Sequence, residues 1–486
     1  MTIETALAWS ISRALLVATL ALPLSVLVWQ WCTAKSNRNA YRMLFPFLGI
    51  LPLFVPDLLI GFTYRLTSAR LVHSVLATEG FYAGLLLCRI VALQVAIRLI
   101  LPGSSVSAES LHSWKLQKVP TTHWWTNWIR LQILGPFRTP LVAWLAGCLI
   151  CFQDFETAAL LQIDRHPIAW TVWLFDAHAA GEPLSNSLRH VLRPLFLQGI
   201  LILPAIIVLG VSQQTSVNTA AARPENRTWQ HSNHFGQMFA CLIVVCGVLA
   251  VVAWPIISHC GPVLDGFRSL LNQHTFLPRM QQIAMSLLTS VLACSLAMSV
   301  SVWLCDVRAR WLALVFVLPG LCGSLFVSLT LLAFFQLPLI NNAYDTWLPL
   351  IVGQSLLMMP KAWLLVTLLN VRNEQSSLHS GQLLVAANTA ATKSTGQNVL
   401  WRLSRRRWLL TLAILSHWCI WDVTVAATLR PVTFEPIVTR LYNEMHYRPT
   451  ETLVALTVLT FAIPFIAYLL AGFVWKHCPQ QRDINA

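Results

Sequence analysis

Five ionisable side chains stand within or at the ends of long apolar runs in the sequence. Asp57, Arg89 and Lys361 lie inside such runs, and Asp154 and Asp422 lie close to the ends of two others. Placing a charge in a membrane is energetically unfavourable, so residues of this kind mark solute paths, ion sites or structural pairs. We expect Asp57, Arg89 and Lys361 to be candidates for lining a translocation path, and Asp154 and Asp422 to be candidates for an outer gate.

Each of these positions also has a structural interpretation. Arg89 and Lys361 could pair with Asp57, cap helix carbonyls, or extend along a helix to the membrane surface. Asp57 directly follows Pro56, where a break in a helix is expected. Asp154 and Asp422 could be solvated helix ends, and the sequence leaves these alternatives open.

The composition excludes an ordinary soluble enzyme. Of the 486 residues, 56% are hydrophobic and 11% are charged, whereas a soluble domain is about one quarter charged. The net charge of +14 comes mainly from Lys and Arg in short stretches between apolar runs. That distribution is typical of membrane topology and not of nucleic-acid binding. Most cysteines lie within apolar runs, and we expect no metal site, because neither they nor the histidines show a complete metal-ligand spacing.

The apolar runs predict an all-α polytopic membrane protein, because about 20 residues are needed to cross the hydrocarbon core. The eleven expected helices cover residues 7–31, 44–66, 81–101, 136–155, 195–211, 238–257, 283–304, 311–337, 347–370, 408–429 and 452–475. A twelfth, partial or re-entrant helix is expected near 169–180.

The distribution of positive charge predicts the orientation. With the N-terminus outside, the inner loops hold twice as many Lys and Arg residues as the outer loops, as the positive-inside rule requires. The C-terminus is then cytoplasmic, together with two long basic loops at 102–135 and 371–407.

An internal repeat is indicated by six collinear matches at an offset of 268 to 274 residues. They are Val28-Trp29 with Val302-Trp303, Phe54-Val55 with Phe326-Val327, Arg89 with Lys361, Arg130-Leu131 with Arg402-Leu403, Cys151 and Asp154 with Cys419 and Asp422, and Pro167-Ile168 with Pro436-Ile437. The matches predict two parallel five-helix repeats joined by a connecting helix. We expect a first repeat at 1–211, a cytoplasmic linker with the connecting helix at 212–278, and a second repeat at 279–486.

Several elements carry a resemblance to a known family. Residues 52–56 (Pro-Leu-Phe-Val-Pro) with Gly61 resemble a proline-rich pattern of the second core helix, and 154–160 and 422–428 resemble an Asp-containing helix end followed by Ala-Ala. Residues 439–442 (Thr-Arg-Leu-Tyr) are similar to a Thr-x-x-Tyr element that comes next. Over nearly its whole length the chain resembles the membrane subunits of bacterial ABC importers, especially the fused two-copy permeases of the ferric iron and thiamine group.

The cytoplasmic coupling loops of that family carry the motif Glu-Ala-Ala followed by a later Gly. Only part of this motif is present at the corresponding positions of this sequence. The second half has Thr389-Ala390-Ala391 and Thr395-Gly396, with Thr in place of Glu, and the first half has Ala108-Glu109-Ser110. The resemblance implies that two short amphipathic helices, at 109–130 and 386–403, dock onto an ATPase, the alternative being basic loops held near anionic lipid. The candidate coupling residues are Glu109, Ser110, Arg130, Ala390, Ala391, Gly396 and Arg402.

The sequence contains no Gly-x-x-x-x-Gly-Lys-Ser/Thr phosphate loop, so we expect the chain to bind no cofactor itself and ATP to be hydrolysed on a separate subunit. The chain is then a transporter subunit and not an enzyme. The resemblance implies two ABC ATPase subunits and a periplasmic substrate-binding protein as partners, in the bacterial inner membrane, with ferric iron or another small solute as substrate. Two other interpretations stay open: an ion-coupled secondary transporter that uses Asp57, and a degenerate membrane scaffold derived from a permease.

Overall fold

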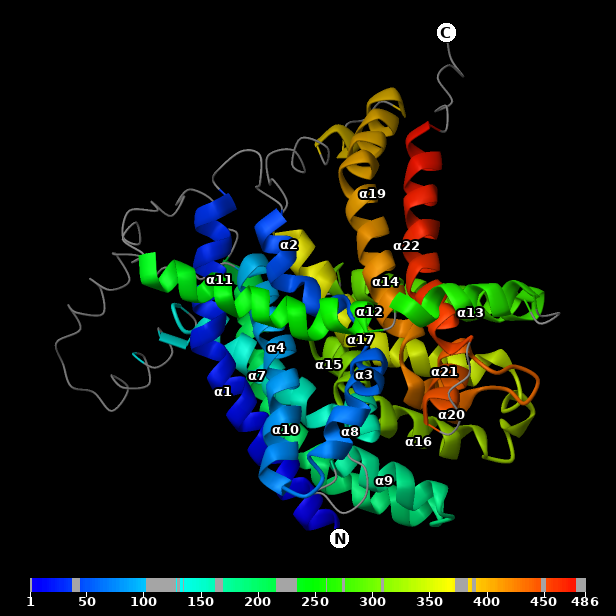
Figure 1. Cartoon of the computed structure of the whole chain (residues 1–486). Helices are drawn as coiled ribbons and strands as arrows, with labels where there is room; N and C mark the ends of the chain where they lie inside the picture. The colour runs from blue at the N-terminus through cyan, green and yellow to red at the C-terminus, as the bar shows by residue number, and fades with distance from the viewer. Residues whose placement is uncertain are drawn as a thin grey trace. The chain divides into compact units, whose positions relative to one another are not determined.

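The computed structural model contains helices and turns, without any strand, in the part of the chain that it describes. This part comprises residues 2–36, 44–101, 128, 132–133, 135–161, 169–215, 234–258, 260–272, 276–306, 310–371, 383–386, 390–446 and 452–477. The all-helical fold class is therefore confirmed. The chain divides into two compact units, Met1–His259 and Cys260–Ala486, whose helices are labelled in Figure 1.

The first unit is built from long apolar helices and shorter helices at bends. Its elements are α1 (Ile3–Ser36), α2 (Leu44–Ile50), η2 (Leu51–Phe54), α3 (Asp57–Arg70), α4 (Val75–Ile100), α7 (Arg138–Gln153), α8 (Glu156–Leu161), α9 (Trp170–Ala179), α10 (Leu184–Thr215), α11 (His234–Val248), η3 (Leu249–Ala253) and α12 (Trp254–Ile257). The short helix α9 lies where the sequence predicts a partial helix.

The second unit begins with the amphipathic helix α13, which packs against the last helix of the chain, α22. Its elements are α13 (Cys260–Asn272), α14 (Phe276–Asp306), α15 (Arg310–Leu321), α16 (Ser324–Phe335), η4 (Asn341–Ala343), α17 (Trp347–Val371), α19 (Ala390–Ile420), α20 (Val423–Leu429), α21 (Ile437–His446) and α22 (Leu453–His477).

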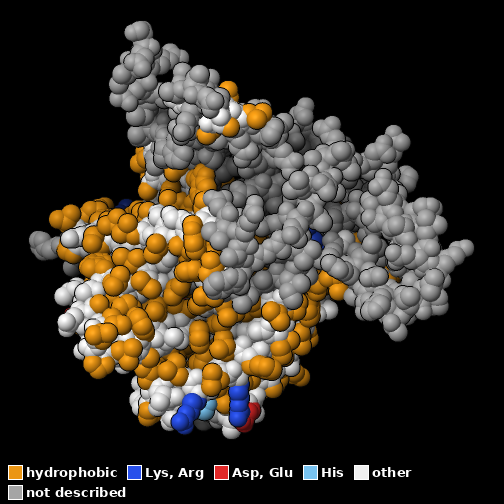
Figure 2. All heavy atoms as spheres, turned by 180° about the vertical axis from the view of Figure 1, so that it is seen from behind, with side chains coloured by type: hydrophobic (Ala, Val, Ile, Leu, Met, Phe, Trp, Pro, Cys, Tyr) orange, Lys and Arg blue, Asp and Glu red, His pale blue; other side chains and the backbone are white. Residues whose placement is uncertain are grey.

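Among the described residues, six helices are long and apolar enough to cross a membrane, and the number rises to nine if each of three bent helix pairs is one span. The expected count of eleven is not confirmed. The two expected spans outside the nine are 136–155, which coincides with the 16-residue helix α7, and 195–211, which lies within the 32-residue helix α10. On the face drawn in Figure 2, hydrophobic side chains cover most of the described surface.

The long helices pack through small residues and turn large ones outward. In α1, Ala14, Ala18 and Ala21 are fully or almost fully buried, whereas Leu16 and Leu20 are at least half exposed. Helix α14 has the same character, with small side chains buried and leucines exposed; the buried residues are Ser286, Ser290, Ala293, Ala297 and Ser301, and the exposed ones are Leu288, Leu292 and Leu296. Small residues at helix contacts are typical of membrane proteins, where lipid covers the larger apolar side chains.

Three of the expected spans are bent, and two of the bends lie at Pro56 and Gly323. The pairs α2/η2–α3, α15–α16 and α19–α20 bend by 72°, 115° and 65°. Pro56 precedes α3 with an extended backbone, as the sequence predicts. Gly323 lies at the sharpest bend with φ of 96°, a conformation that glycine adopts without steric strain.

Helix α11 continues into a π-helical stretch, η3, before α12. The O–H of Tyr64, on α3, donates to the carbonyl of Ala250 at 2.6 Å. A π-helical turn weakens the regular pairing of backbone groups. The Tyr64 hydroxyl therefore supplies a donor to a backbone carbonyl within this irregular segment.

Helices α3 and α8 approach so closely that only glycine fits at one position. A Cβ atom on Gly61 would lie 2.9 Å from the Cβ of Leu160, and a Cβ atom on Gly84 would meet nothing within 4 Å. We expect Gly61→Ala to reduce the free energy of unfolding by about 1–3 kcal/mol, the usual effect of overpacking. The matched variant Gly84→Ala should leave it unchanged or raise it by up to about 1 kcal/mol through helix propensity.

Thermal unfolding of both variants in detergent micelles measures this difference. Equal unfolding temperatures for Gly61→Ala and Gly84→Ala would contradict the close contact between α3 and α8.

Candidate functional site

Asp57 begins helix α3 at the bend that follows Pro56, and it is paired there with Arg89. The Arg89 guanidinium, on α4, forms an ion pair with Oδ1 of Asp57. The two side chains are 15% and 27% exposed, so the pair is mostly shielded from the surroundings. Of the alternatives that the sequence leaves open for Arg89, pairing with Asp57 is the one present in the structure.

Asp154 lies at the break between α7 and α8 and is 8% exposed. Its Oδ2 accepts a hydrogen bond from the Tyr82 hydroxyl at 2.5 Å and another from the backbone N–H of Ala158 at 3.2 Å. Its backbone carbonyl accepts from the hydroxyl of Thr171 at 2.7 Å. Asp154 therefore connects α4, α8 and α9 through hydrogen bonds. At the end of α7 it is hydrogen-bonded within the protein and is not a solvated helix end.

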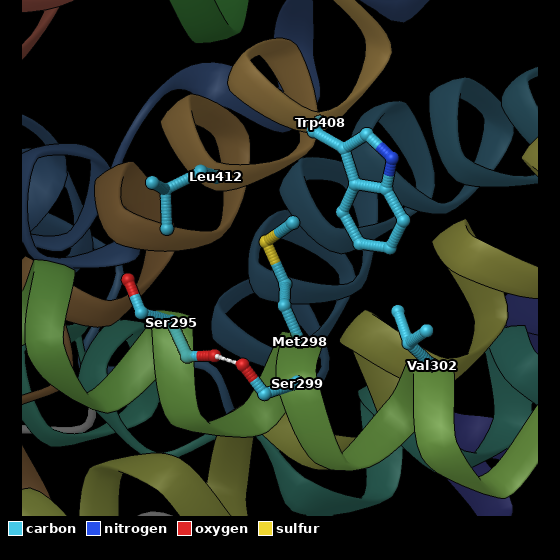
Figure 3. Close-up of a pocket in the computed structure, with 6 residues that line it drawn as sticks. All are labelled: Ser295, Met298, Ser299, Val302, Trp408 and Leu412. Carbon is cyan, nitrogen blue, oxygen red and sulfur yellow. Dashed lines mark hydrogen bonds between the residues drawn. The ribbon is translucent and has the colours of Figure 1, made fainter. Parts of the chain in front are cut away.

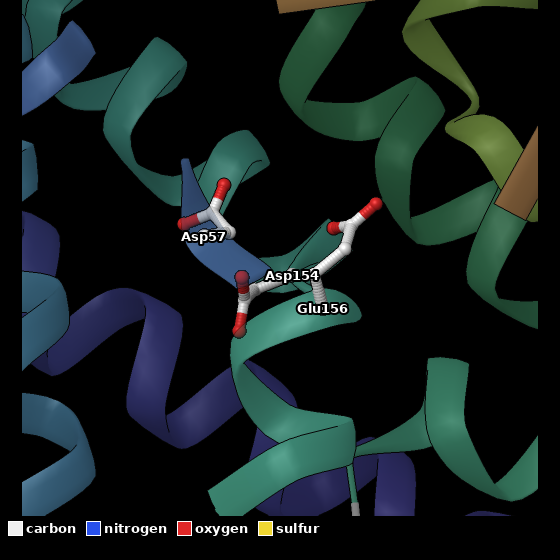
Figure 4. Close-up of side chains that lie close together, drawn as sticks. All are labelled: Asp57, Asp154 and Glu156. Carbon is white, nitrogen blue, oxygen red and sulfur yellow. The ribbon is translucent and has the colours of Figure 1, made fainter. Parts of the chain in front are cut away.

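The carboxylates of Asp57, Asp154 and Glu156 gather at the two helix bends. One oxygen from each lies within 4.8 Å of the other two. Figure 4 shows the three side chains. The hydroxyl of Thr157 donates to Oδ1 of Asp57 at 3.2 Å. Oxygen ligands of this kind suit hard cations, but the Arg89 guanidinium already brings positive charge to the group.

A second ion pair in this unit was not anticipated from the sequence. Arg13, on α1, donates from Nε and Nη2 to the two carboxylate oxygens of Glu79, on α4, at 2.9 and 2.7 Å. The Arg13 guanidinium also lies 4.5 Å from the ring centroid of Tyr82, the donor to Asp154. The sequence contains one indication of this pair. Arg13 lies within the first apolar run and Glu79 lies just before the third, so both are near the N-terminal ends of their helices.

Further hydrogen bonds join α1 and α4 on the C-terminal side of the Arg13–Glu79 pair. The amide of Gln94 donates to the carbonyl of Ala18 at 3.1 Å, and the Ser25 hydroxyl donates to Oε1 of Gln94 at 3.0 Å. Arg98 then donates from Nε to the Ser25 hydroxyl at 3.3 Å. Since these residues advance together on both helices, α1 and α4 are parallel, and the Arg13–Glu79 pair fixes their N-terminal halves.

In the second unit, Asp422 caps a helix and Lys361 lies against an aromatic ring. Oδ1 of Asp422 accepts from the backbone N–H of Val425 at 2.8 Å, at the start of α20. Nζ of Lys361, on α17, lies 5.7 Å from the ring centroid of Trp418, on α19. Asp422 therefore caps α20, because its carboxylate accepts from a backbone N–H at the bend between α19 and α20 that has no partner within the helix.

The candidate coupling residues of the first half, Glu109, Ser110 and Arg130, lie outside the described residues. In the second half, Ala390, Ala391, Gly396 and Arg402 all belong to the continuous helix α19. The expected separate short helix at 386–403 is therefore, from Ala390 onward, the first part of a 31-residue helix. The sequence contains no proline between these residues and the span, and arginines, which favour helices, connect the two.

No protein-family model, no curated protein and no solved structure matches the chain in the three comparisons. The fold defines the chain as an all-helical protein, whose described part contains six to nine candidate membrane spans. Within its first unit, ion pairs and hydrogen bonds connect α1, α3, α4, α7, α8 and α9.

The ion pair between Arg89 and Asp57 generates a prediction for stability. Arg89→Met leaves the carboxylate without its cation, and we expect the free energy of unfolding to fall by about 2–3 kcal/mol, less than for a fully buried pair because both groups are partly exposed. The double variant Arg89→Met/Asp57→Asn removes both charges and should recover part of that loss.

Unfolding in mixed micelles of a mild detergent and sodium dodecyl sulfate measures both effects. Arg193 pairs with Glu4 where both side chains are more than 60% exposed, so the control Arg193→Met should change stability by at most about 1 kcal/mol. An additive loss in the double variant would show that Arg89 and Asp57 are not coupled.

Proposed function

We propose that the chain is the transmembrane permease subunit of an ABC importer, in which each unit is one helical bundle and a separate subunit hydrolyses ATP. The observation that carries this proposal is a shared succession of helices. In each unit a long helix (α1, α14) is followed by a bent pair (α2/η2–α3, α15–α16) and a second long helix (α4, α17). Two helices separated by a short break (α7–α8, α19–α20), a short helix (α9, α21) and another long helix (α10, α22) come next.

The packing within the two units supports a repeat. The first long helix packs on the second in each unit, α1 on α4 and α14 on α17. The second helices of these pairs also pack together, α3 on α8 and α16 on α20. If the two halves of the chain had unrelated folds, we would not expect them to share both the order and the packing of their helices.

A matched hydrogen bond adds to this support. The backbone N–H of Trp170, the first residue of α9, donates to the Ser10 hydroxyl of α1 at 3.1 Å. The backbone N–H of Ile437, the first residue of α21, donates to the Ser286 hydroxyl of α14 at 2.9 Å. In both units a serine of the first long helix thus holds the start of the short helix.

The charges at repeated positions favour transport over a purely structural role. Arg89 and Lys361 stand at matched positions on α4 and α17, but the position that corresponds to Asp57 is Leu329. Intramembrane charges mark substrate and ion paths. With these charges on the helices that follow the first bend, we infer a path for a small solute, with ferric iron as one candidate.

A second candidate function is an ion-coupled secondary transporter. The group of Asp57, Asp154 and Glu156, with oxygens within 4.8 Å of one another, favours this candidate. Intramembrane carboxylates form proton relays in pumps and transporters, and ion sites of secondary transporters lie at broken helices.

Coupling to an ATPase tests the first proposal. We expect Arg402→Glu and Ala391→Asp, both in the first half of α19, to abolish co-purification with the ATPase subunit and to reduce its stimulated ATP hydrolysis at least tenfold. The control Val432→Glu changes an exposed residue between α20 and α21 and should have no effect. Gly396→Ala, a milder change in the same segment, should give an intermediate loss.

Transport in liposomes separates the two candidate functions. Uptake that requires ATP and the ATPase subunit supports the permease. Uptake that proceeds on a proton or sodium gradient alone, and is lost in Asp57→Asn, would overturn the permease in favour of the secondary transporter.

A further inference from the structure

A cavity of about 460 Å³ lies between helices α14 and α19 of the second unit. Its lining residues are Ser295, Met298, Ser299 and Val302 of α14, and Trp408 and Leu412 of α19. In Figure 3, Leu412 lies at the Ser295 end and Trp408 lies toward Val302, so the two helices run in opposite directions along the cavity. The volume falls within the range of sites for small organic molecules, about 300–1,000 Å³.

The cavity opens on an apolar surface of α14. Ser299 is exposed, whereas the neighbouring Met298 is 6% exposed. Leu296 and Trp303 lie one turn before and one turn after Ser299 on the same face of the helix, and each is 46% exposed. The Ser299 hydroxyl already donates to the carbonyl of Ser295 at 2.8 Å. An apolar chain that enters from this surface therefore leaves the serine hydrogen bond intact.

Positive charge follows the cavity at one end. The two turns of α19 before Trp408 contain four arginines, Arg402, Arg405, Arg406 and Arg407. Because α19 runs from them into the cavity, they lie beyond its Trp408 end. Arg405 comes one turn before Trp408 and two turns before Leu412, so these three positions share a face of the helix. Helix α19 contains no acidic residue, and the single one of α14, Asp306, is outnumbered at this end.

The succession of apolar lining, tryptophan and arginines matches the layers of one membrane leaflet. Helix α14 rises about 10 Å from Ser295 to Val302, which is less than half of the roughly 30 Å hydrocarbon core. Tryptophan side chains are enriched at the level of the lipid headgroups, and Trp408 lies between the cavity and the arginines. Basic groups next to membrane helices bind anionic headgroups. An acyl chain in the cavity would therefore bring its phosphate to the arginines.

We propose that α14 and α19 form a binding site for one anionic phospholipid, with an acyl chain in the cavity and the phosphate beside the arginines that precede Trp408. A zwitterionic lipid has the same chains but carries an ammonium group, which the arginines repel. The site therefore selects lipids by the charge of the headgroup. It lies within the second unit and does not depend on the proposed permease function.

Lipid binding to the purified full-length protein tests the site. The protein is delipidated in a mild detergent, dioleoyl phosphatidylglycerol or dioleoyl phosphatidylcholine is added, and bound lipids are counted by native mass spectrometry. We expect one tightly bound phosphatidylglycerol per chain, and binding of phosphatidylcholine that is weaker by about tenfold or more. Equal affinities for the two lipids would overturn the proposal, and this comparison needs only the wild-type protein.

A charge variant tests the headgroup end. Arg405→Gln should weaken binding of phosphatidylglycerol about fivefold, the usual contribution of one basic residue near an anionic headgroup. The matched control Arg268→Gln removes an arginine of α13 whose side chain is 80% exposed, and it should bind as the wild type does. Equal affinities in these two variants would show that the arginines before Trp408 do not hold the headgroup.

A cavity-filling variant tests the chain end. Ser299→Phe should weaken binding of both lipids about tenfold, because the acyl chain then buries fewer methylene groups. The control Leu288→Phe changes a residue of α14 that is 49% exposed and does not line the cavity, and it should have no effect. Undiminished binding in Ser299→Phe would overturn the proposal, because the lipid would then lie outside the cavity.

Tryptophan quenching locates the chain if Ser299→Phe does not fold. Phosphatidylglycerol that is brominated in its acyl chains quenches the tryptophan side chains that it contacts. We expect one equivalent of this lipid to remove more emission from the wild type than from Trp408→Phe. Equal losses in the two proteins would overturn the proposal.

Discussion

A bend in a membrane helix leaves backbone N–H and C=O groups without their usual partners, and these groups must be satisfied within the protein. At the breaks between α7 and α8 and between α19 and α20, side chains meet this requirement. Asp154 accepts from the backbone of Ala158, and Asp422 accepts from the backbone of Val425. Thr171 in turn donates to the backbone carbonyl of Asp154. Polar residues are therefore concentrated where the helices break, and the candidate site is a consequence of those breaks.

Once carboxylates are placed at the bends, their charge must be neutralised. In the first unit Arg89 of α4 does this for Asp57, and Arg13 of α1 forms a comparable pair with Glu79, which lies near the start of α4 and not at a bend. A guanidinium is suited to this role because it bonds a carboxylate through two parallel N–H groups, as Arg13 does. Removing one partner of such a pair is far more damaging than removing both, so the charges of a pair are expected to change together.

The sequence is a good guide to elements that depend on local patterns and a poor guide to those that depend on register. Apolar runs locate the long helices, and Pro56 locates the first bend. The bend at Gly323 was not anticipated, because a glycine within an apolar run carries no local sign that its φ is positive. The pairing of Arg13 with Glu79 was also missed, because it requires knowing that α1 and α4 are parallel neighbours and how far one is shifted along the other. The pairing of Arg89 with Asp57 was recognised as an alternative, since both lie in neighbouring apolar runs.

The π-helical stretch η3 has a consequence for how this part of the chain tolerates changes in length. A π-helical turn contains one residue more than the α-helical turn it replaces. Loss of a single residue between Leu249 and Ala253 would let this segment close into regular α-helix, with the residues after it keeping nearly their present direction. Loss of one residue from the regular helix α11 would instead rotate everything that follows by about 100°. In that second case Trp254, now 53% exposed, would point in another direction, and Tyr64 would face a different carbonyl from that of Ala250. The stretch η3 is therefore the part of this helix that accommodates a change of one residue.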